Sequence, residues 1–358
     1  MNQTFAWSRT GRRTTIPMAG EPEDFILDLR FRKCTFFLVR KKKRGGAKEY
    51  GRYCGTAFAV AVGLGGSEID KSDWIGGINY AVTAGHVVKN TPADEELFIR
   101  VNKVGLGTHD IKVPIASWKF HKVTDVAVCA VEWPEKIQLD VMTIPVTRLP
   151  QGPEGVYGNG VVEGEEITIV GLLDKFAGTE SIQPIVRTGR IALMPYEKLR
   201  IEVARGVYES VDAYLMEMTS WPGLSGSPII VYPHRNPSNP RSIDFMLPYL
   251  VIGLVHGTLE LDKDIHFSGD VKTVKIGSGI ALAIPGESIR EVLMNNTELC
   301  IQRAELLERQ REKEKPVATP DSIERPEEPP PFTQQDFEAD LRKVSRKVTP
   351  SKSDSKTK

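Results

Sequence analysis

Short apolar runs, separated by turn-forming residues, follow one another from Phe25 to about Ile284. The runs are rich in valine, isoleucine and aromatic residues, and clusters of Gly, Pro, Asn and Asp separate them. β-Branched and aromatic residues favour strands, and turns at this spacing are typical of meanders and Greek keys. The runs lie at residues 34–40, 56–64, 79–85, 96–104, 125–133, 165–173, 185–194, 211–218, 227–232, 249–257 and 278–284. The pattern therefore predicts an all-β protein.

A Pro- and Gly-rich stretch at residues 149–160 divides these runs into two groups of about six. No helical periodicity interrupts either group, so we expect two packed antiparallel β-barrels of six strands each, or a sandwich. This domain is expected to span residues 26–297. An N-terminal extension at residues 1–25, which lacks periodicity, is expected to precede it.

The chain is predicted to become helical after the last strand. Ser288 and Glu291 have the spacing of a capping box. The apolar face of this helix would comprise Ile289, Val292 and Leu293. A highly charged helix is expected to follow at residues 298–315.

Residues 316–358 combine several prolines with many charges of both signs. Such a composition cannot bury enough apolar surface to offset its ordering entropy, so we expect a disordered tail. Its proline-rich segment at residues 326–332 is open to two interpretations, a plain linker or a ligand for a protein partner.

Composition and charge narrow the classes of function. The chain has 47 basic and 47 acidic residues, and this balance argues against a general nucleic-acid coat. No stretch approaches the roughly 20 apolar residues that span a bilayer, and no apolar segment marks a secretion signal. We therefore expect a cytoplasmic protein that does not enter a membrane. Its four cysteines form no CxxC pair, so reduced thiols are expected and zinc is not.

Three short segments contain the residue types that acyl transfer needs. His86 follows an apolar strand in VTAGHV (82–87), Asp125 opens one in TDVAV (124–128), and Ser225 lies in the turn PGLSGSP (222–228). A serine hydroxyl becomes nucleophilic when an imidazole accepts its proton, and a buried carboxylate orients that imidazole. Glycines beside the serine let main-chain N–H groups converge on a developing oxyanion.

These three segments, in the order His, Asp, Ser, resemble those of the chymotrypsin-like (trypsin-fold) serine peptidases. The separations of 39 and 100 residues fit that fold of two six-stranded barrels. The resemblance implies a general base at His86, its orienting carboxylate at Asp125 and a nucleophile at Ser225. It also implies an oxyanion hole formed by the N–H groups of Gly223 and Ser225. No metal or organic cofactor is expected.

Other segments extend the resemblance, at residues 54–58, 186–191, 253–257 and 279–285. The last two of these, together with the turn of Ser225, resemble the bacterial HtrA-like and glutamyl-endopeptidase-like branches. Val87 replaces the cysteine that many secreted members bridge to the Cys54 position. Leu224 replaces the aspartate of the zymogen switch, so we expect an intrinsically formed oxyanion hole or control by another route. The chain after the protease region is too short and polar for a PDZ domain.

The resemblance also suggests the residues of the primary specificity pocket, which are Thr219, Ser220, Val255, His256 and Gly257. Thr219 stands where an aspartate would select arginine or lysine. Because successive strand residues face opposite ways, His256 is expected to pack toward Asp125 and not to read a glutamate side chain. A small or medium uncharged residue is therefore the favoured substrate side chain.

Two alternatives to a constitutive peptidase acting on proteins or peptides stay open. One is a non-catalytic binding module, and the other is a regulated effector that stays inert until a partner forms its oxyanion hole. The basic run at residues 40–44 is expected to be a solvated hairpin tip, with a dock for an acidic partner or nucleic acid as the alternative.

Overall fold

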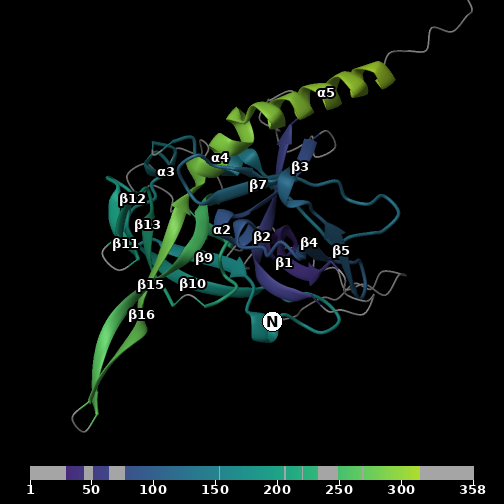
Figure 1. Cartoon of the computed structure of the whole chain (residues 1–358). Helices are drawn as coiled ribbons and strands as arrows, with labels where there is room; N and C mark the ends of the chain where they lie inside the picture. Colours follow the sequence, from purple (N-terminus) through teal and green to yellow (C-terminus); the bar gives the residue numbers. More distant parts are fainter. Residues whose placement is uncertain are drawn as a thin grey trace, which may run out of the picture. The chain divides into compact units, whose positions relative to one another are not determined.

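The computed structural model describes residues 30–43, 51–63, 77–152, 154–204, 207–219, 221–232, 249–267 and 270–314. Strands dominate these residues, as the apolar pattern predicts (Figure 1). The predicted N-terminal extension and the predicted tail lie outside them. No helix in the described ranges is both long and apolar enough to cross a membrane.

The first half of the chain forms one antiparallel sheet with a short parallel addition. Its strands are β1 (Thr35–Lys42), β2 (Arg52–Gly63), β3 (Gly77–Ala84), β4 (Glu95–Asn102), β5 (Thr108–Lys112), β6 (Lys119–Phe120), β7 (Val126–Ala130) and β8 (Ile144–Pro145). The order is β5-β4-β1-β2-β3-β7-β6, and β8 pairs with β2. This sheet has eight strands where six were predicted, and its described ends, β5 and β6, are not paired with each other. The 3₁₀ helix η1 (Ile115–Ser117) separates these two strands.

The second half of the chain forms a closed six-stranded barrel, as predicted. Its strands are β9 (Glu166–Gly171), β10 (Ile185–Leu193), β13 (Tyr214–Glu217), β14 (Pro228–Val231), β15 (Leu250–Phe267) and β16 (Asp270–Pro285). The barrel closes because β9 pairs with both β10 and β14. Strands β11 (Leu199–Ala204) and β12 (Val207–Val211) form a separate hairpin.

Strands β15 and β16 continue past the barrel as a long two-stranded ribbon (Figure 1). Strand β14 pairs with β15 only as far as Leu254, whereas β15 and β16 stay paired to Phe267 and Asp270. The part of β15 within the barrel contains His256, so the ribbon continues directly from the site described below.

The remaining helices are short, except for the last two. They are α1 (Arg30–Cys34), α2 (Gly85–Lys89), η2 (Val146–Arg148), α3 (Glu154–Tyr157), η3 (Asp174–Phe176), α4 (Gly286–Asn295) and α5 (Thr297–Glu314). The charged helix predicted at 298–315 is confirmed as α5. By its internal contacts the chain divides into two units, Met1–Leu307 and Glu308–Lys358, and the site described below lies in the first.

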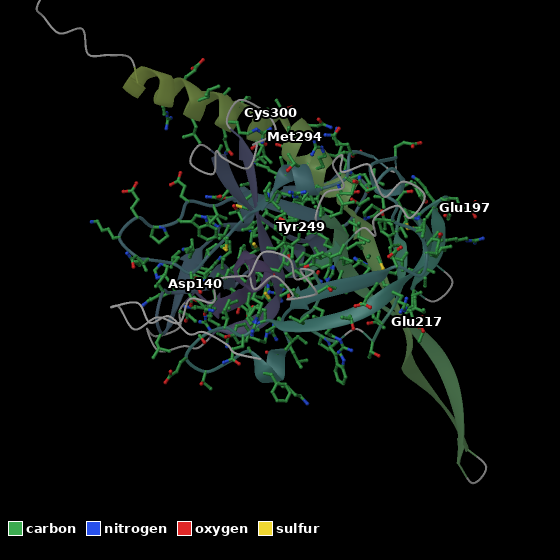
Figure 2. All side chains as sticks on the ribbon, turned by 180° about the vertical axis from the view of Figure 1, so that it is seen from behind. Asp140, Glu197, Glu217, Tyr249, Met294 and Cys300 are labelled. Carbon is green, nitrogen blue, oxygen red and sulfur yellow. The ribbon has the colours of Figure 1, made fainter. Side chains whose placement is uncertain are left out.

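Helix α4 follows the second barrel in sequence but packs on the core of the first half. Its predicted apolar residues Ile289, Val292 and Leu293 are buried in the hydrophobic cluster of the first sheet. The predicted capping box is wrong, because the helix begins at Gly286 after Pro285, and Ser288 is buried inside its first turn. The Cys300 thiol of α5 donates to the Met294 carbonyl oxygen at 3.1 Å (Figure 2), which joins the two helices.

The basic run that begins at Arg40 is tied into the first sheet. Arg40 donates to the Val87 carbonyl oxygen at 2.7 Å, and Lys41 pairs with Asp110 at 2.6 Å. Lys43 donates to the Ala93 carbonyl oxygen at 2.7 Å. The expectation of a solvated hairpin tip is therefore wrong for Arg40 and Lys41, which are partly buried with acceptors from the protein, whereas Lys42 and Lys43 are exposed as expected.

Candidate active site

Ser225 lies in the second of two consecutive tight turns that are built around glycines. In the first turn the Leu224 N–H donates to the Trp221 carbonyl oxygen at 3.2 Å, and Gly223 has a φ of 102°. Proline followed by a residue of positive φ is the signature of a type II turn. In the second turn the Ser227 N–H donates to the Leu224 carbonyl oxygen at 2.9 Å, and Gly226 has a φ of 88°. Ser225 is the first corner residue of this second turn.

Thr56 of strand β2 fastens this turn to the first half of the chain. Its N–H donates to the Ser225 carbonyl oxygen at 3.0 Å, and its hydroxyl donates to the Gly223 carbonyl oxygen at 2.7 Å. Strand β2 lies so close that a Cβ at Gly226 would come within 2.1 Å of the Thr56 carbonyl oxygen. Only glycine fits there, for reasons of both conformation and space. Thr56 could not be recognised as a site residue from the sequence, because a buried threonine in a strand carries no distinctive signal.

Antiparallel pairing of strands β3 and β7 places His86 beside Asp125. The last residue of β3, Ala84, pairs with Val126, the first residue of β7. His86 lies in helix α2, directly after β3, and its Nδ1 is 2.6 Å from Asp125 Oδ2. The His86 N–H also donates to Asp125 Oδ1 at 2.8 Å. A Cβ at Gly85 would lie 2.7 Å from that same oxygen, so glycine permits the close approach.

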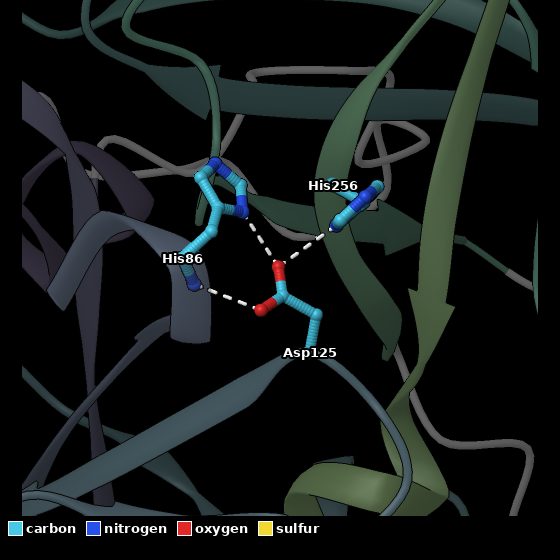
Figure 3. Close-up of side chains that lie close together, drawn as sticks. All are labelled: His86, Asp125 and His256. Carbon is cyan, nitrogen blue, oxygen red and sulfur yellow. Dashed lines mark hydrogen bonds and ion pairs between the residues drawn. The ribbon is translucent and has the colours of Figure 1, made fainter. Parts of the chain in front are cut away.

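A second imidazole, that of His256, contacts the same carboxylate. His256 Nδ1 is 2.8 Å from Asp125 Oδ2, and the two rings meet edge to face with centroids 5.2 Å apart (Figure 3). The prediction that His256 packs toward Asp125 is confirmed. A β-bulge causes this orientation, because the pairing of β15 with β16 shifts between Val255 and Gly257. Bulges of this kind re-aim single side chains beside functional sites.

The two imidazoles keep Asp125 ionised. Burial of the side chain opposes ionisation, but hydrogen bonds from His256 and His86 outweigh it and hold the pKa of Asp125 well below its ordinary value. An ionised carboxylate can only accept hydrogen bonds, so both Nδ1 atoms carry hydrogen. The Nε2 atom of a neutral His86 is therefore left as a proton acceptor, which is the tautomer a general base needs.

The Ser225 hydroxyl is hydrogen-bonded to a group other than this base. It donates to the main-chain carbonyl oxygen of His256 at 3.0 Å, and no hydrogen bond joins it to the His86 ring within the described part of the chain. To leave the His256 carbonyl oxygen, the Ser225 hydroxyl would rotate about the Cα–Cβ bond to another staggered position. His256 thus contacts two of the three predicted residues, Asp125 through its ring and Ser225 through its main chain.

Two main-chain donors beside Ser225 are unused. The N–H groups of Gly223 and Ser225 make no main-chain hydrogen bond to any described residue, whereas the Leu224 N–H between them closes a turn. Free N–H groups of the serine itself and of the residue two before it can converge on an oxyanion.

The residues predicted for the specificity pocket do not all lie together. Val255 is 1% exposed and packs in the hydrophobic core of the second barrel, so its assignment to the pocket is wrong. Thr219 is exposed, and a Cβ at Gly257 would meet no atom within 4 Å, so both lie at open positions. Ser220 lies outside the described residues. The bulge that turns His256 toward Asp125 also accounts for the inward orientation of Val255.

His86, Asp125 and His256 form the one group of potential metal ligands among the described residues, with ligand atoms within 4.8 Å of one another. Ligand atoms about 2.0–2.2 Å from a tetrahedral zinc ion lie roughly 3.3 Å apart. The two Nδ1 atoms are closer than that to Asp125 Oδ2, at 2.6 and 2.8 Å. These are hydrogen-bond distances, so in this arrangement a hydrogen atom lies between Asp125 and each of the two imidazoles.

No protein-family model matches the sequence, and no curated protein matches it at a significant level. Among solved structures, human heparin binding protein is similar over 75% of this chain and 94% of its own. The identity is 11% and the TM-score is 0.41. At this level of similarity, the strand pairing and the closed barrel define the fold. The hydrogen bonds among its residues define the site.

Proposed function

We propose that the protein is a serine endopeptidase of the chymotrypsin-like type, acting on protein or peptide substrates. The observation that carries the proposal is the contact of His86 with Asp125 at 2.6 Å, in the tautomer that leaves Nε2 free. The N–H groups of Gly223 and Ser225, which donate to no described main-chain carbonyl, support it. We further propose that the protein acts in the cytoplasm and that its C-terminal tail serves as a linker or binds a protein partner.

In this mechanism the Ser225 oxygen attacks the scissile carbonyl carbon while His86 Nε2 takes the hydroxyl proton. Asp125 stabilises the imidazolium ion, and the Gly223 and Ser225 N–H groups stabilise the oxyanion, each contributing about 3–4 kcal/mol. His86 then returns the proton to the leaving amine. Water releases the acyl group from Ser225 by the same steps. The open positions of Thr219 and Gly257 are consistent with a small or medium uncharged substrate residue.

A second form of this function is favoured by the hydroxyl of Ser225. Its hydrogen bond to the His256 carbonyl oxygen must break before His86 can accept the proton. A protease in which a partner or the substrate brings about that rotation would look inert on general substrates. A non-catalytic binding module is the remaining alternative, and nothing in such a module requires an imidazole tautomer set by a carboxylate.

Labelling with a fluorophosphonate probe tests the proposal. The wild type should be labelled, and Ser225→Ala should not. Ser227→Ala is the matched control, since Ser227 is in the same turn but its buried hydroxyl has no hydrogen-bond partner. Labelling of Ser225→Ala at the wild-type rate would exclude Ser225 as the nucleophile. Absence of labelling in all three, with and without peptide substrates, would favour the binding module.

A further inference from the structure

His121 organises the turn from which Asp125 projects. The turn joins strands β6 and β7, and the His121 N–H donates to the Val126 carbonyl oxygen at 3.0 Å. Inside the turn, His121 Nδ1 receives the Thr124 N–H at 2.8 Å and lies 2.7 Å from the Thr124 hydroxyl oxygen. Thr124 directly precedes Asp125, so the imidazole fixes the residue that comes immediately before the carboxylate.

These contacts determine the tautomer of His121. A main-chain N–H can only donate, so Nδ1 must be the unprotonated nitrogen and the Thr124 hydroxyl donates to it as well. The hydrogen of a neutral ring is then on Nε2, which lies 2.9 Å from Glu291 Oε2. Glu291 is thus the acceptor that complements this tautomer. The His121 side chain is only 13% exposed, so its ring is held inside the turn, whereas the side chain of its partner Glu291 is 60% exposed.

Glu291 comes from helix α4, which packs on the core of the first half of the chain through its buried residues Ile289 and Leu293. A separate link, an ion pair between Lys119 and Glu298, joins strand β6 to helix α5. On its other side Asp125 is fixed by the Gly85 N–H, which donates to the Asp125 carbonyl oxygen at 2.9 Å. The backbone of Asp125 is therefore held between helix α2 and His121.

We propose that His121 is a positioning residue for Asp125, and that Glu291 of helix α4 maintains the His121 tautomer that this role needs. The proposal rests on the proposed function, because it assigns the placement of the carboxylate that orients His86. Docking of the C-terminal helices then contributes directly to the geometry of the active site.

Two substitutions of His121 separate positioning from packing. In His121→Asn the side-chain oxygen stands near the place of Nδ1 and can accept the Thr124 N–H. In His121→Gln the longer side chain can reach Glu291, but it places no acceptor where Nδ1 receives the Thr124 N–H. We expect the glutamine variant to lose about tenfold to a hundredfold in the rate of fluorophosphonate labelling, since small misplacements of reacting groups cost that much. The asparagine variant should stay within about threefold of the wild type.

Glu291 provides a second and independent pair of variants. Glu291→Gln keeps an acceptor for the Nε2 hydrogen and should label at nearly the wild-type rate, whereas Glu291→Ala should label about threefold to tenfold more slowly. Glu298→Gln is the matched control, because it weakens the neighbouring ion pair between strand β6 and helix α5 without touching His121. It should not change the labelling rate.

The low-field NMR signal of the hydrogen between His86 and Asp125 provides a readout that needs no catalysis. It should move or broaden in His121→Gln and Glu291→Ala but not in His121→Asn or Glu298→Gln. An unchanged signal and labelling rate in His121→Gln would overturn the proposal, as would equal losses in His121→Gln and His121→Asn. If the wild type is not labelled at all, the proposed function fails, but the NMR signal still decides whether His121 positions Asp125.

Discussion

His86 and His256 share one carboxylate oxygen, Asp125 Oδ2, at 2.6 and 2.8 Å from their Nδ1 atoms. One ring comes from the first half of the chain and the other from the closed barrel of the second half. The carboxylate is therefore held by residues from both halves of the chain. Besides the hydrogen bond from His86, Oδ2 accepts a second hydrogen bond, from His256. In the proposed mechanism this pairing holds Asp125 still while His86 gains and loses a proton.

Replacement of His256 should slow the reaction without abolishing it. His256→Ala removes one of the hydrogen bonds to Asp125, so the carboxylate gains freedom to rotate away from His86. We expect the rate of fluorophosphonate labelling to fall about tenfold, in line with the loss of a charge-assisted hydrogen bond of about 1.5–3 kcal/mol. His256→Asn, whose amide can donate from nearly the same position, should recover most of the rate. Equal rates in the wild type and His256→Ala would show that His86 alone orients the carboxylate.

The low pKa of Asp125 predicts how the stability of the protein depends on pH. Its folded pKa is below the ordinary value of 3.8, so its ionised form stabilises the folded state. This contribution is fully present above pH 4 or so and is lost as the pH falls from there toward the folded pKa. The free energy of unfolding of the wild type should therefore exceed that of Asp125→Asn at pH 6, and the difference should shrink progressively below about pH 4. Urea unfolding of both proteins over this range measures it, and a difference independent of pH would contradict the assignment.

The placement of His86 and Asp125 could be predicted from sequence because local patterns determine it. Each follows or opens an apolar strand, and antiparallel pairing of those strands brings their ends together. The orientation of His256 also agrees with the prediction, although a β-bulge beside it, and not regular alternation, produces that orientation. The placement of the other two residues depends on periodicity, which a single sequence displays.

The position of Val255 could not be predicted in the same way. The bulge beside it arises from the pairing of β15 with β16, and no residue type in the segment marks it. Likewise, the spacing of Ser288 and Glu291 is that of a capping box. In the structure, however, packing of α4 buries the serine, and Glu291 forms a hydrogen bond with His121 instead. Contacts between distant segments decide such details.

Gly226 should be irreplaceable because of both its conformation and its surroundings. Gly226→Ala would place a Cβ 2.1 Å from the Thr56 carbonyl oxygen at a φ of 88°. Gly105→Ala is the matched control, since Gly105 also has a positive φ, of 96°, but a Cβ there would meet no atom within 4 Å. The control should lose about 1–2 kcal/mol of unfolding free energy from conformation alone. Gly226→Ala should lose clearly more, and also its labelling by the probe. Equal losses in denaturant titrations would show that the turn can move away from β2.

Thr56 should determine whether the turns that contain Gly223 and Ser225 keep their shape. Its hydroxyl donates to the Gly223 carbonyl oxygen at 2.7 Å and accepts the Leu172 N–H at 2.9 Å. Thr56→Val keeps the volume but leaves both of these main-chain groups without their partner, which costs about 1–3 kcal/mol for each buried group. Gly223 would then be free to turn its N–H away from the oxyanion, so labelling should fall by more than global unfolding explains. Thr56→Ser retains the hydroxyl and should label almost normally. The comparison is made at a temperature where both variants are fully folded by circular dichroism. A valine variant that labels as fast as the serine variant would show that the two consecutive turns hold the oxyanion donors without help from β2.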